Sequence, residues 1–353
     1  MGRYLGELLR RAPDLLPSDV EIVAAIRPDH AARLAAVAPR VRAIPVGARG
    51  YSLAEHRELP RAFARAGCDL VHVPHYVLPI GLRSPAVVTV HDLIHVRVPR
   101  TPLHALYARA MLGVVRRHAR IVLAPSAAVA RVLTDIAGIA PDRVRVVPNG
   151  VADAFLATGP APASEVAAFV ARRALPTPYV LNVTNGLPHK GLDVLLRSLR
   201  AIPGLGLAIA GAGSGRASVR RALARSGLPA VVELGELGDE ELRLAYAGSA
   251  AVVVPSRDEG FGLPALEAMA VGAPVVVSDA GALPEVVGDA AVVVPAGSVA
   301  CLTGALYRMA FEIQPTEREG LIQRGLTRAR QFPWDRSARA TCAALEQALR
   351  GPA

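Results

Sequence analysis

The sequence predicts an α/β fold in two domains, each built around a parallel sheet. Short apolar runs alternate with helix-like stretches along the whole chain, which is the pattern of doubly wound parallel sheets. With 353 residues, the chain is long enough for two domains that each have a full core. A content of 52% hydrophobic and 20% charged residues is typical of globular proteins.

Eleven apolar runs are expected to form the strands of these two sheets. In the first half they cover residues 20–25, 70–73, 86–90, 121–124 and 144–147. In the second half they cover residues 179–183, 206–210, 231–234, 251–254, 274–277 and 291–294. Because a helix-like stretch follows most of them, neighbouring strands should run parallel.

A segment rich in proline, glycine and alanine, residues 156–164, separates the two halves and is predicted to be a linker. It would divide an N-terminal domain, residues 1–155, from a C-terminal domain, residues 165–332. The first residues carry charge too early for an export signal and look like the start of a helix.

Composition excludes several classes of function. Aromatic residues make up only 4% of the chain and do not interleave the basic ones, so a nucleic-acid partner is not expected. Cys68, Cys301 and Cys342 are few, far apart and odd in number, which argues against a disulfide framework or zinc site and for a reducing compartment. No apolar stretch is long enough to span a membrane. We therefore expect a cytoplasmic protein.

Positive charge is concentrated in the first half. Residues 1–160 hold 21 arginines against 12 acidic residues, whereas the rest holds 19 basic against 18 acidic residues. Residues 102–120 add a basic amphipathic helix, which predicts peripheral binding to an anionic membrane on its inner face. An ordinary core-facing helix would show the same pattern, so that alternative stays open. The apolar positions are Leu103, Leu106, Tyr107, Met111, Val114 and Val115, and the arginines are Arg109, Arg116, Arg117 and Arg120.

The most informative motif places two carboxylates, Glu259 and Glu267, on either side of a loop that becomes a helix. A strand precedes the loop, Gly260 and Gly262 lie within it, and Pro264 suits the first helical position. Free backbone amides and the positive end of the helix dipole favour a phosphate there. Carboxylates on both sides can accept hydrogen bonds from hydroxyl groups, so the layout fits a sugar nucleotide.

Lys190 is the one lysine among 40 basic residues. It lies in the loop that follows the run at 179–183, where an α/β sheet places its ligand contacts. A compact ammonium there can follow the charge that develops on a diphosphate, which a planar guanidinium does with a different geometry.

Five motifs in order resemble the family 4 retaining glycosyltransferases, which have the GT-B fold of two facing Rossmann-like domains. They are Val147–Val151, Asn185–Gly191, Leu234–Leu237, Ser256–Gly272 and Ser278–Val287. In the first half, His91-Asp92 and the loop Pro74–Pro79 are similar to mannosyl- or rhamnosyltransferase-like members. The segment from Phe332 resembles the one that crosses back in this family, so residues 333–353 should complete the first domain.

The chain departs from the family at its start. Members usually begin with a strand and a glycine-rich loop that ends in a Gly-Arg-Tyr-like sequence, whereas this sequence begins at Met1-Gly2-Arg3-Tyr4. We therefore expect the first strand of the N-terminal domain to be absent, which would leave a neighbouring strand unpaired.

The resemblance implies a role for each motif residue. Glu267 would accept hydrogen bonds from the ribose and Glu259 from the transferred sugar, the alternatives being a solvated helix glutamate and a loop charge. His91 would approach the reacting centre, or be only a satisfied structural histidine. The other donor-binding residues would be Asn185 and Lys190 at the phosphates, Phe261, Gly262 and Leu263 through their N–H groups, and Gly235, Glu236 and Leu237 at the base. Of all these, His91, Lys190 and Glu259 are the catalytic candidates.

The expected activity is retaining transfer of a hexosyl or deoxyhexosyl unit from a nucleotide diphosphate sugar, with GDP or UDP favoured, to a hydroxyl acceptor. The acceptor would be lipid-linked or a growing polysaccharide, and neither a metal nor a cofactor is expected. The alternatives are a non-catalytic sugar-nucleotide-binding scaffold and a nucleotide-sugar epimerase. The glycines of Gly211–Gly215 also resemble a dinucleotide fingerprint, but such spacing is common where a strand packs on a helix.

Overall fold

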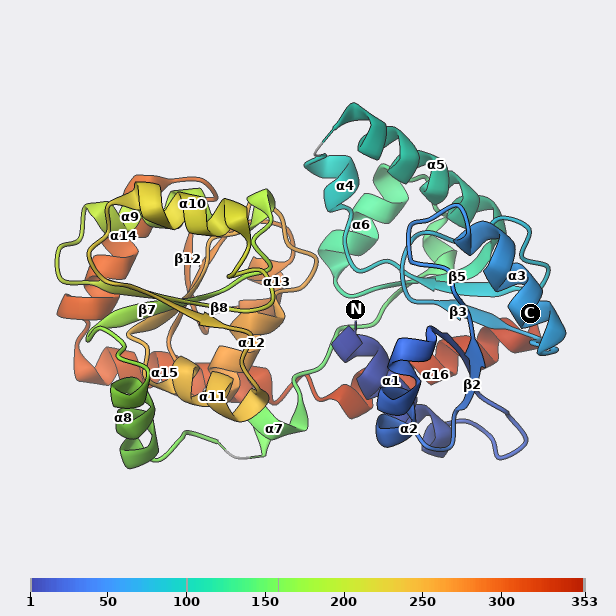
Figure 1. Ribbon diagram of the computed structural model, residues 1–353, viewed down its shortest axis with the longest axis horizontal. Coiled ribbons are helices and arrows are strands. Elements are labelled where there is room, and N and C mark those ends of the chain that lie inside the picture. The colour runs from blue at the N-terminus through green and yellow to red at the C-terminus, as the bar shows by residue number, and fades with distance from the viewer. Residues whose placement is uncertain (1, 100, 158, 352–353) are drawn as a thin grey trace. The chain divides into compact units, whose positions relative to one another are not determined.

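The computed structural model describes residues 2–99, 101–157 and 159–351. The chain divides into two compact units, Met1–Gly150 with Trp334–Ala353 and Val151–Pro333 (Figure 1). Each unit is built on parallel strands, which confirms the predicted α/β class.

The second unit contains one six-stranded parallel sheet in the order β12-β11-β10-β7-β8-β9. Its strands are β7 (Tyr179–Val183), β8 (Gly206–Ala210), β9 (Val231–Gly235), β10 (Ala251–Val254), β11 (Val275–Ser278) and β12 (Val292–Val294). Helices α9 (Leu192–Arg200), α10 (Ala217–Ser226) and α14 (Val299–Tyr307) cover one face in Figure 1. Helices α11 (Asp239–Ala247), α12 (Leu263–Ala270) and α15 (Pro315–Ala329) cover the other.

The strand order of this sheet reverses between β7 and β10. The chain builds β7, β8 and β9 outward in one direction and then returns to place β10 on the opposite side of β7. The loops after β7 and β10 therefore leave the sheet in opposite directions. In open α/β sheets, ligands bind at this reversal, outside the carboxyl ends of the strands.

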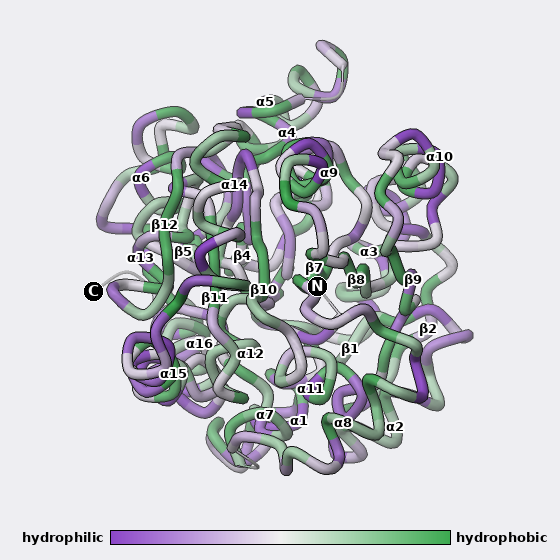
Figure 2. Tube along the Cα trace, turned by 90° about the vertical axis from the view of Figure 1, so that its left-hand side faces the viewer, coloured by the Kyte–Doolittle hydropathy of each residue, from purple (hydrophilic) through white to green (hydrophobic). Residues whose placement is uncertain are grey.

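Burial on both faces explains why the strands of this unit are apolar runs without alternation. All residues of β8, β10 and β11 are buried, as expected for a parallel sheet covered by helices on each side. Figure 2 shows hydrophilic stretches on surrounding helices such as α10 and α15. The hydrophobic core thus lies on the central strands and holds the loops at their carboxyl ends in place.

The first unit contains two separate parallel sheets. One pairs β1 (Val23–Ile26) with β2 (Arg42–Pro45), and the other has the order β3-β4-β5-β6. The latter strands are β3 (Val71–Val73), β4 (Ala86–Thr89), β5 (Ala119–Ala124) and β6 (Val144–Val146). Strand β2 was not predicted, because Arg42 and Pro45 interrupt its short apolar run. Proline is tolerated in such a strand because it lies at the edge of the sheet.

The two ends of the chain pack together in the first unit. Helix α16 (Trp334–Arg350) contacts α1 (Gly2–Leu15) and lies against β4 and β5. Trp334 is buried in a cluster with Tyr4, Leu8 and Cys342. A Cβ atom at Gly150 would overlap the Trp334 backbone, so this position requires glycine.

The remaining helices are short or connect the strands. They are α2 (Ala31–Val37), α3 (Glu55–Arg65), α4 (Ile94–Arg97), α5 (Pro102–His118), α6 (Ala127–Asp135), α7 (Asp153–Leu156), α8 (Ala163–Arg172) and α13 (Leu283–Val287). Helices α7 and α8 include both ends of the expected linker at 156–164, whose Thr158 lies outside the described residues. Within the described ranges, no helix has the length and apolarity to cross a membrane.

Candidate functional site

The loops after β7 and β10 are locked together by their backbones. Arg257 N–H donates to the His189 carbonyl at 2.7 Å. Gly191 has a φ of 68°, and a Cβ atom there would overlap the Pro255 carbonyl. Only glycine combines this left-handed conformation with so close an approach. The reversal point of the sheet is therefore bordered by two loops of fixed relative position.

A second interaction fixes the same two loops from the solvent side. The Arg257 guanidinium donates to both carboxylate oxygens of Asp193, at 2.8 and 2.6 Å, and to the Pro188 carbonyl at 3.1 Å. The hydrogen bond from Arg257 lowers the pKa of Asp193 below its ordinary value. This two-point geometry restrains the loop that carries Lys190.

Lys190 and Glu259 meet at this point of the sheet. Lys190 Nζ donates to Glu259 Oε2 at 2.7 Å, and Ser256 Oγ donates to the same oxygen at 3.0 Å. The Lys190 and Glu259 side chains are only 18% and 12% exposed. Both interactions use Oε2, so among the described residues Oε1 keeps no hydrogen-bond partner. The pair thus presents an ammonium and a free carboxylate oxygen side by side.

The loop after β11 supports Glu259 from behind. Ala282 N–H donates to the Glu259 carbonyl at 2.9 Å. Gly281 has a φ of 57°, and a Cβ atom there would overlap that carbonyl oxygen. Ser278 Oγ also donates to the Ser256 carbonyl at 2.5 Å. Three consecutive parallel strands, β7, β10 and β11, therefore contribute to one constellation.

The N-terminus of α12 presents free amides beside this pair. The helix starts at Leu263, one residue before Pro264, and its N-cap Gly262 has a φ of 100°. The N–H groups of Phe261, Gly262 and Leu263 donate no hydrogen bond to any described residue. Phe261 is buried and packs on Phe332, with ring centroids 5.8 Å apart. Such an anchored turn is suited to bind an anion.

Glu267 lies in the same helix and is only 5% exposed. Tyr246 O–H donates to Glu267 Oε2 at 3.0 Å. The alternative that Glu267 is a solvated helix glutamate is therefore wrong. A buried carboxylate needs hydrogen-bond donors, and Tyr246 supplies one of them.

Asn185 is exposed, and its Oδ1 accepts from Leu187 N–H at 3.2 Å, whereas its amide nitrogen donates to no described residue. The nearby glycine run packs directly on this loop. Cβ atoms at Gly211 and Gly213 would overlap the backbones of Thr184 and Asn185. These two glycines therefore have a packing role, which was the alternative to a dinucleotide fingerprint.

Gly235, Glu236 and Leu237 follow at the end of β9. Gly235 has a φ of 73°, and its carbonyl accepts from Gly211 N–H at 2.7 Å. Glu236 is exposed and Leu237 is half-buried. The backbone of this turn is thus fixed to the glycine run at the carboxyl end of the sheet.

His91 belongs to the first unit and follows β4. Its ring packs edge-on against Tyr4, with centroids 4.7 Å apart. Its Nε2 is buried and has no hydrogen-bond partner among the described residues. Burial lowers the pKa of His91 to about 3, so the ring is neutral at neutral pH. The interpretation as a fully satisfied structural histidine is therefore wrong for Nε2.

Three further polar side chains contribute to the site although the sequence analysis gave them no role. Ser256 and Ser278 begin two of the family motifs but were assigned no contact, and Tyr246 lies 21 residues before the carboxylate that it contacts. Their roles depend on which loops the sheet brings together. In the part of the chain that the structure describes, no three His, Cys, Asp or Glu side chains are grouped to hold a metal ion.

Comparison with known proteins places both halves in one class. Residues 166–310 match the family described as "Glycosyl transferases group 1" and residues 1–155 match "Glycosyltransferase Family 4". A D-inositol 3-phosphate glycosyltransferase of Actinosynnema mirum is 31% identical over 386 residues, which cover 94% of this chain and 88% of the relative. An MMP alpha-(1->4)-mannosyltransferase of Mycolicibacterium hassiacum is 32% identical and covers 67% of this chain and 56% of the relative.

Several curated relatives are matched over a smaller part of their length. The chain spans 26%, 56% and 51% of the lengths of three of them, the M. hassiacum enzyme being the one at 56%. Among solved structures, the Anabaena protein HepE in complex with UDP and glucose superposes with a TM-score of 0.79 at 18% identity, covering 98% of this chain and 96% of HepE. At this identity the likeness shows the GT-B fold alone.

Proposed function

Because the chain belongs to glycosyltransferase family 4, we propose that it moves a hexosyl or deoxyhexosyl unit from a nucleotide diphosphate sugar to a hydroxyl acceptor with retention of configuration. One observation carries the proposal. Lys190, the Glu259 carboxylate and the free amides of α12 come together at the strand-order reversal of the second unit. This arrangement offers cationic, carboxylate and amide groups to a diphosphate and its sugar.

The charge that develops on the departing diphosphate would be stabilised by Lys190 and the N–H groups of Phe261 and Gly262. Asn185 would donate to a phosphate oxygen from its amide nitrogen. The step needs no covalent nucleophile if the leaving phosphate oxygen takes the proton of the attacking hydroxyl. Because the protein supplies these donors itself, we propose that transfer continues in excess EDTA.

Glu259 would accept a hydrogen bond from a hydroxyl of the transferred sugar through Oε1, the oxygen that neither Lys190 nor Ser256 uses. We propose that Glu267 receives the ribose hydroxyls and that the turn Gly235–Leu237 contacts the base through its backbone. The neutral His91 would accept a hydrogen bond at its unpartnered Nε2 from a hydroxyl group of the transferred sugar or of the acceptor, without taking up the proton. These roles give each carboxylate an uncharged hydroxyl partner.

The nucleotide is proposed to be UDP or GDP. UDP is supported by HepE, which shares the fold and was solved with UDP, and GDP is supported by a mannosyltransferase among the relatives. A thermal-shift comparison of UDP, GDP, dTDP and ADP tests the choice. UDP or GDP should raise the melting temperature most, and a stronger effect of dTDP or ADP would overturn it.

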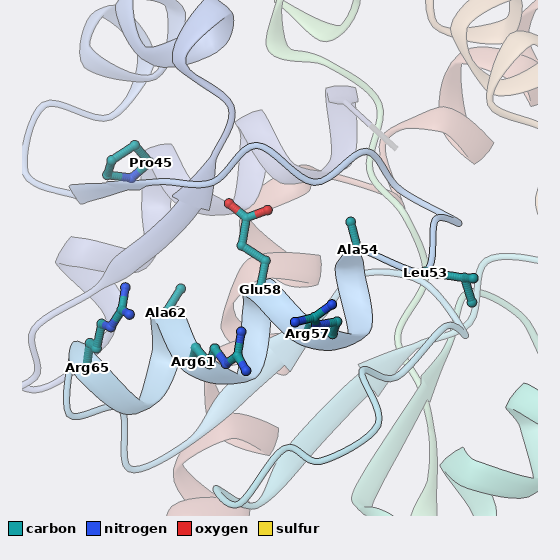
Figure 3. Close-up of a pocket in the computed structure, with 8 residues that line it drawn as sticks. All are labelled: Pro45, Leu53, Ala54, Arg57, Glu58, Arg61, Ala62 and Arg65. Atoms are coloured by element: carbon teal, nitrogen blue, oxygen red, sulfur yellow. The ribbon is translucent and has the colours of Figure 1, made fainter.

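We also propose that the first unit binds an anionic membrane surface from the cytoplasmic side and receives a lipid-linked acceptor there, for polysaccharide synthesis. Arg57, Arg61 and Arg65 of α3 are exposed beside a groove of about 520 Å³ (Figure 3). No ion pair joins these three arginines to another described residue. Leu53 at the groove and Leu103 and Leu106 of α5 are 85%, 72% and 65% exposed. In contrast, Ala105, Ala108, Met111 and Val115 of α5 are buried, so one face along the whole helix packs on the core.

The proposed activity is tested by incubating the protein with UDP- and GDP-hexoses and measuring the release of free nucleotide, with and without crude glycolipid as acceptor. The proposal requires release with at least one donor, and acceptor should accelerate it. Binding of nucleotide without release under any of these conditions would contradict the transferase and favour a sugar-nucleotide-binding scaffold.

A further inference from the structure

Tyr51 of the first unit has an unusual backbone conformation. It lies in the loop before α3 with a φ of 63°, a left-handed conformation that bulky residues seldom adopt. Such a conformation persists only where the surroundings over-determine it, and it is concentrated at ligand-binding sites. The Tyr51 side chain is nevertheless half-exposed at 49%, so core packing does not explain why the residue is held there.

Buried Glu55 holds the backbone of Tyr51 in place. The Tyr51 N–H donates to Glu55 Oε2 at 2.7 Å, and His75 Nε2 lies 3.1 Å from Glu55 Oε1. Val77 N–H donates to His75 Nδ1, so the His75 proton resides on Nε2 and is donated to Glu55. With an exposure of only 3%, Glu55 is committed to positioning these two groups.

The Tyr51 ring is also held by neighbouring rings. It stacks on His75 with centroids 5.4 Å apart and an interplanar angle of 29°. Tyr76 and His95 meet it at steeper angles, 6.0 and 6.4 Å away. Burial raises the pKa of Tyr51 to about 12, so its hydroxyl keeps its proton. An anchored aromatic ring with a protonated hydroxyl therefore belongs to a residue that is half-exposed.

Polar groups with spare hydrogen-bonding capacity border this ring. Tyr76 Oη and His95 Nδ1 are 2.9 Å apart, and His95 Nε2 has no partner among the described residues. His75 and Tyr76 follow β3, whereas His95 follows β4, so the cluster lies at the carboxyl ends of parallel strands. That is the edge at which α/β sheets bind ligands.

We propose that the exposed face of Tyr51 is a stacking platform for a cyclic polyol, a pyranose or inositol ring, in the acceptor. Such a ring has an apolar C–H face that suits an aromatic surface and a rim of hydroxyls that suits His95 and the Tyr51 hydroxyl. This inference rests on the proposed transferase function and adds the chemical class of the acceptor. An aliphatic chain would leave the polar rim without partners.

Saturation-transfer NMR with methyl α-D-mannopyranoside, myo-inositol and hexanol as separate probes tests the platform. When the aromatic protons of the protein are saturated, the saturation should pass to the C–H protons of one ring face in at least one polyol, and more weakly to hexanol. Tyr51→Ala should weaken polyol binding roughly three- to tenfold, and Tyr51→Phe should retain most of it. Tyr307→Ala is the matched control, since Tyr307 is 45% exposed in the second unit.

The proposal would be overturned if saturation transfer to the polyols were absent in wild type, or equal in wild type and Tyr51→Ala. It would also be overturned if Tyr307→Ala reduced the transfer as much as Tyr51→Ala does, or if transfer to hexanol were stronger than to the polyols. Circular dichroism confirms that each variant is folded. Titration with UDP and GDP is carried out on the same samples. Polyol binding without nucleotide binding would contradict the proposed function but leave the platform standing, and the reverse would contradict only the platform.

Discussion

The two units position their functional side chains by different means. In the second unit one continuous sheet brings three loops together, and glycines at 191 and 281 let backbones approach so closely that Lys190 and Glu259 have little freedom. In the first unit the strands form two sheets, and the notable groups are histidines and tyrosines that are held by other side chains. Backbone packing therefore positions the site of the second unit, whereas contacts between side chains position the groups of the first unit.

The largest effect is expected from Lys190→Ala. It removes the cation proposed to stabilise the departing diphosphate, so kcat should fall by roughly 10²- to 10³-fold. Lys190→Arg keeps the charge in another geometry and should recover only part of the rate. Steady-state kinetics with a labelled nucleotide sugar measures both. A kcat within about twofold of wild type for Lys190→Ala would remove Lys190 from the mechanism.

Gly281→Ala tests the role of backbone approach in the second unit. A Cβ atom there overlaps the Glu259 carbonyl at a φ of 57°, so the β11 loop or Glu259 must move. We expect a loss of about 2–4 kcal/mol in the free energy of unfolding, together with reduced turnover.

The matched control for this change is Gly297→Ala. Gly297 has a φ of 79° but nothing within 4 Å of its Cβ position, so only the conformational strain of about 1 kcal/mol applies. Urea unfolding compares the two variants. If both lose the same stability, the close packing behind Glu259 does not matter.

Replacing Arg57, Arg61 and Arg65 together by glutamine should weaken binding of the first unit to anionic vesicles. At about 1 kcal/mol for each arginine near the surface, affinity should fall at least tenfold at low salt. The control replaces Arg216, Arg221 and Arg225 in and beside α10 of the second unit. Vesicle sedimentation distinguishes them, and an equal loss in both variants would mean that general charge, not the α3 groove, determines binding.

Acidification should destabilise the first unit through two histidines. Burial lowers the pKa of His72 to about 4 and that of His91 to about 3, from an ordinary value of 6.5. At pH values between the lowered pKa of the folded protein and the ordinary pKa of 6.5, the unfolded chain binds more protons than the folded one. The free energy of unfolding therefore decreases as the pH falls below about 6.5. The loss should be roughly 1–2 kcal/mol per histidine at about pH 5.

Urea unfolding at about pH 7.5 and pH 5 measures this effect, since the two values lie on either side of the ordinary histidine pKa. His72→Asn and His91→Asn should each show a smaller difference between the two pH values than wild type. An unchanged difference in both variants would mean that these histidines are not held neutral by the fold.

The eleven predicted strands correspond to observed ones because strands buried on both faces leave apolar runs that are visible in any window. Strand β2 escaped because Arg42 and Pro45 make it resemble a loop. Motifs indicated that Lys190 and Glu259 lie in loops that follow different strands, and each loop was predicted to contact the donor. That Lys190 and Ser256 share one oxygen of Glu259 could not be predicted, because it depends on the packing of residues up to 69 positions apart.

Hydrogen–deuterium exchange with and without UDP or GDP tests most directly the claim that the strand-order reversal of the second unit binds the donor. We expect one of these nucleotides to slow exchange at the amides of residues 261–263 and in the loop 185–190, and Lys190→Ala to weaken this protection. Protection confined to other segments, or none at saturating concentrations of UDP and GDP, would contradict it.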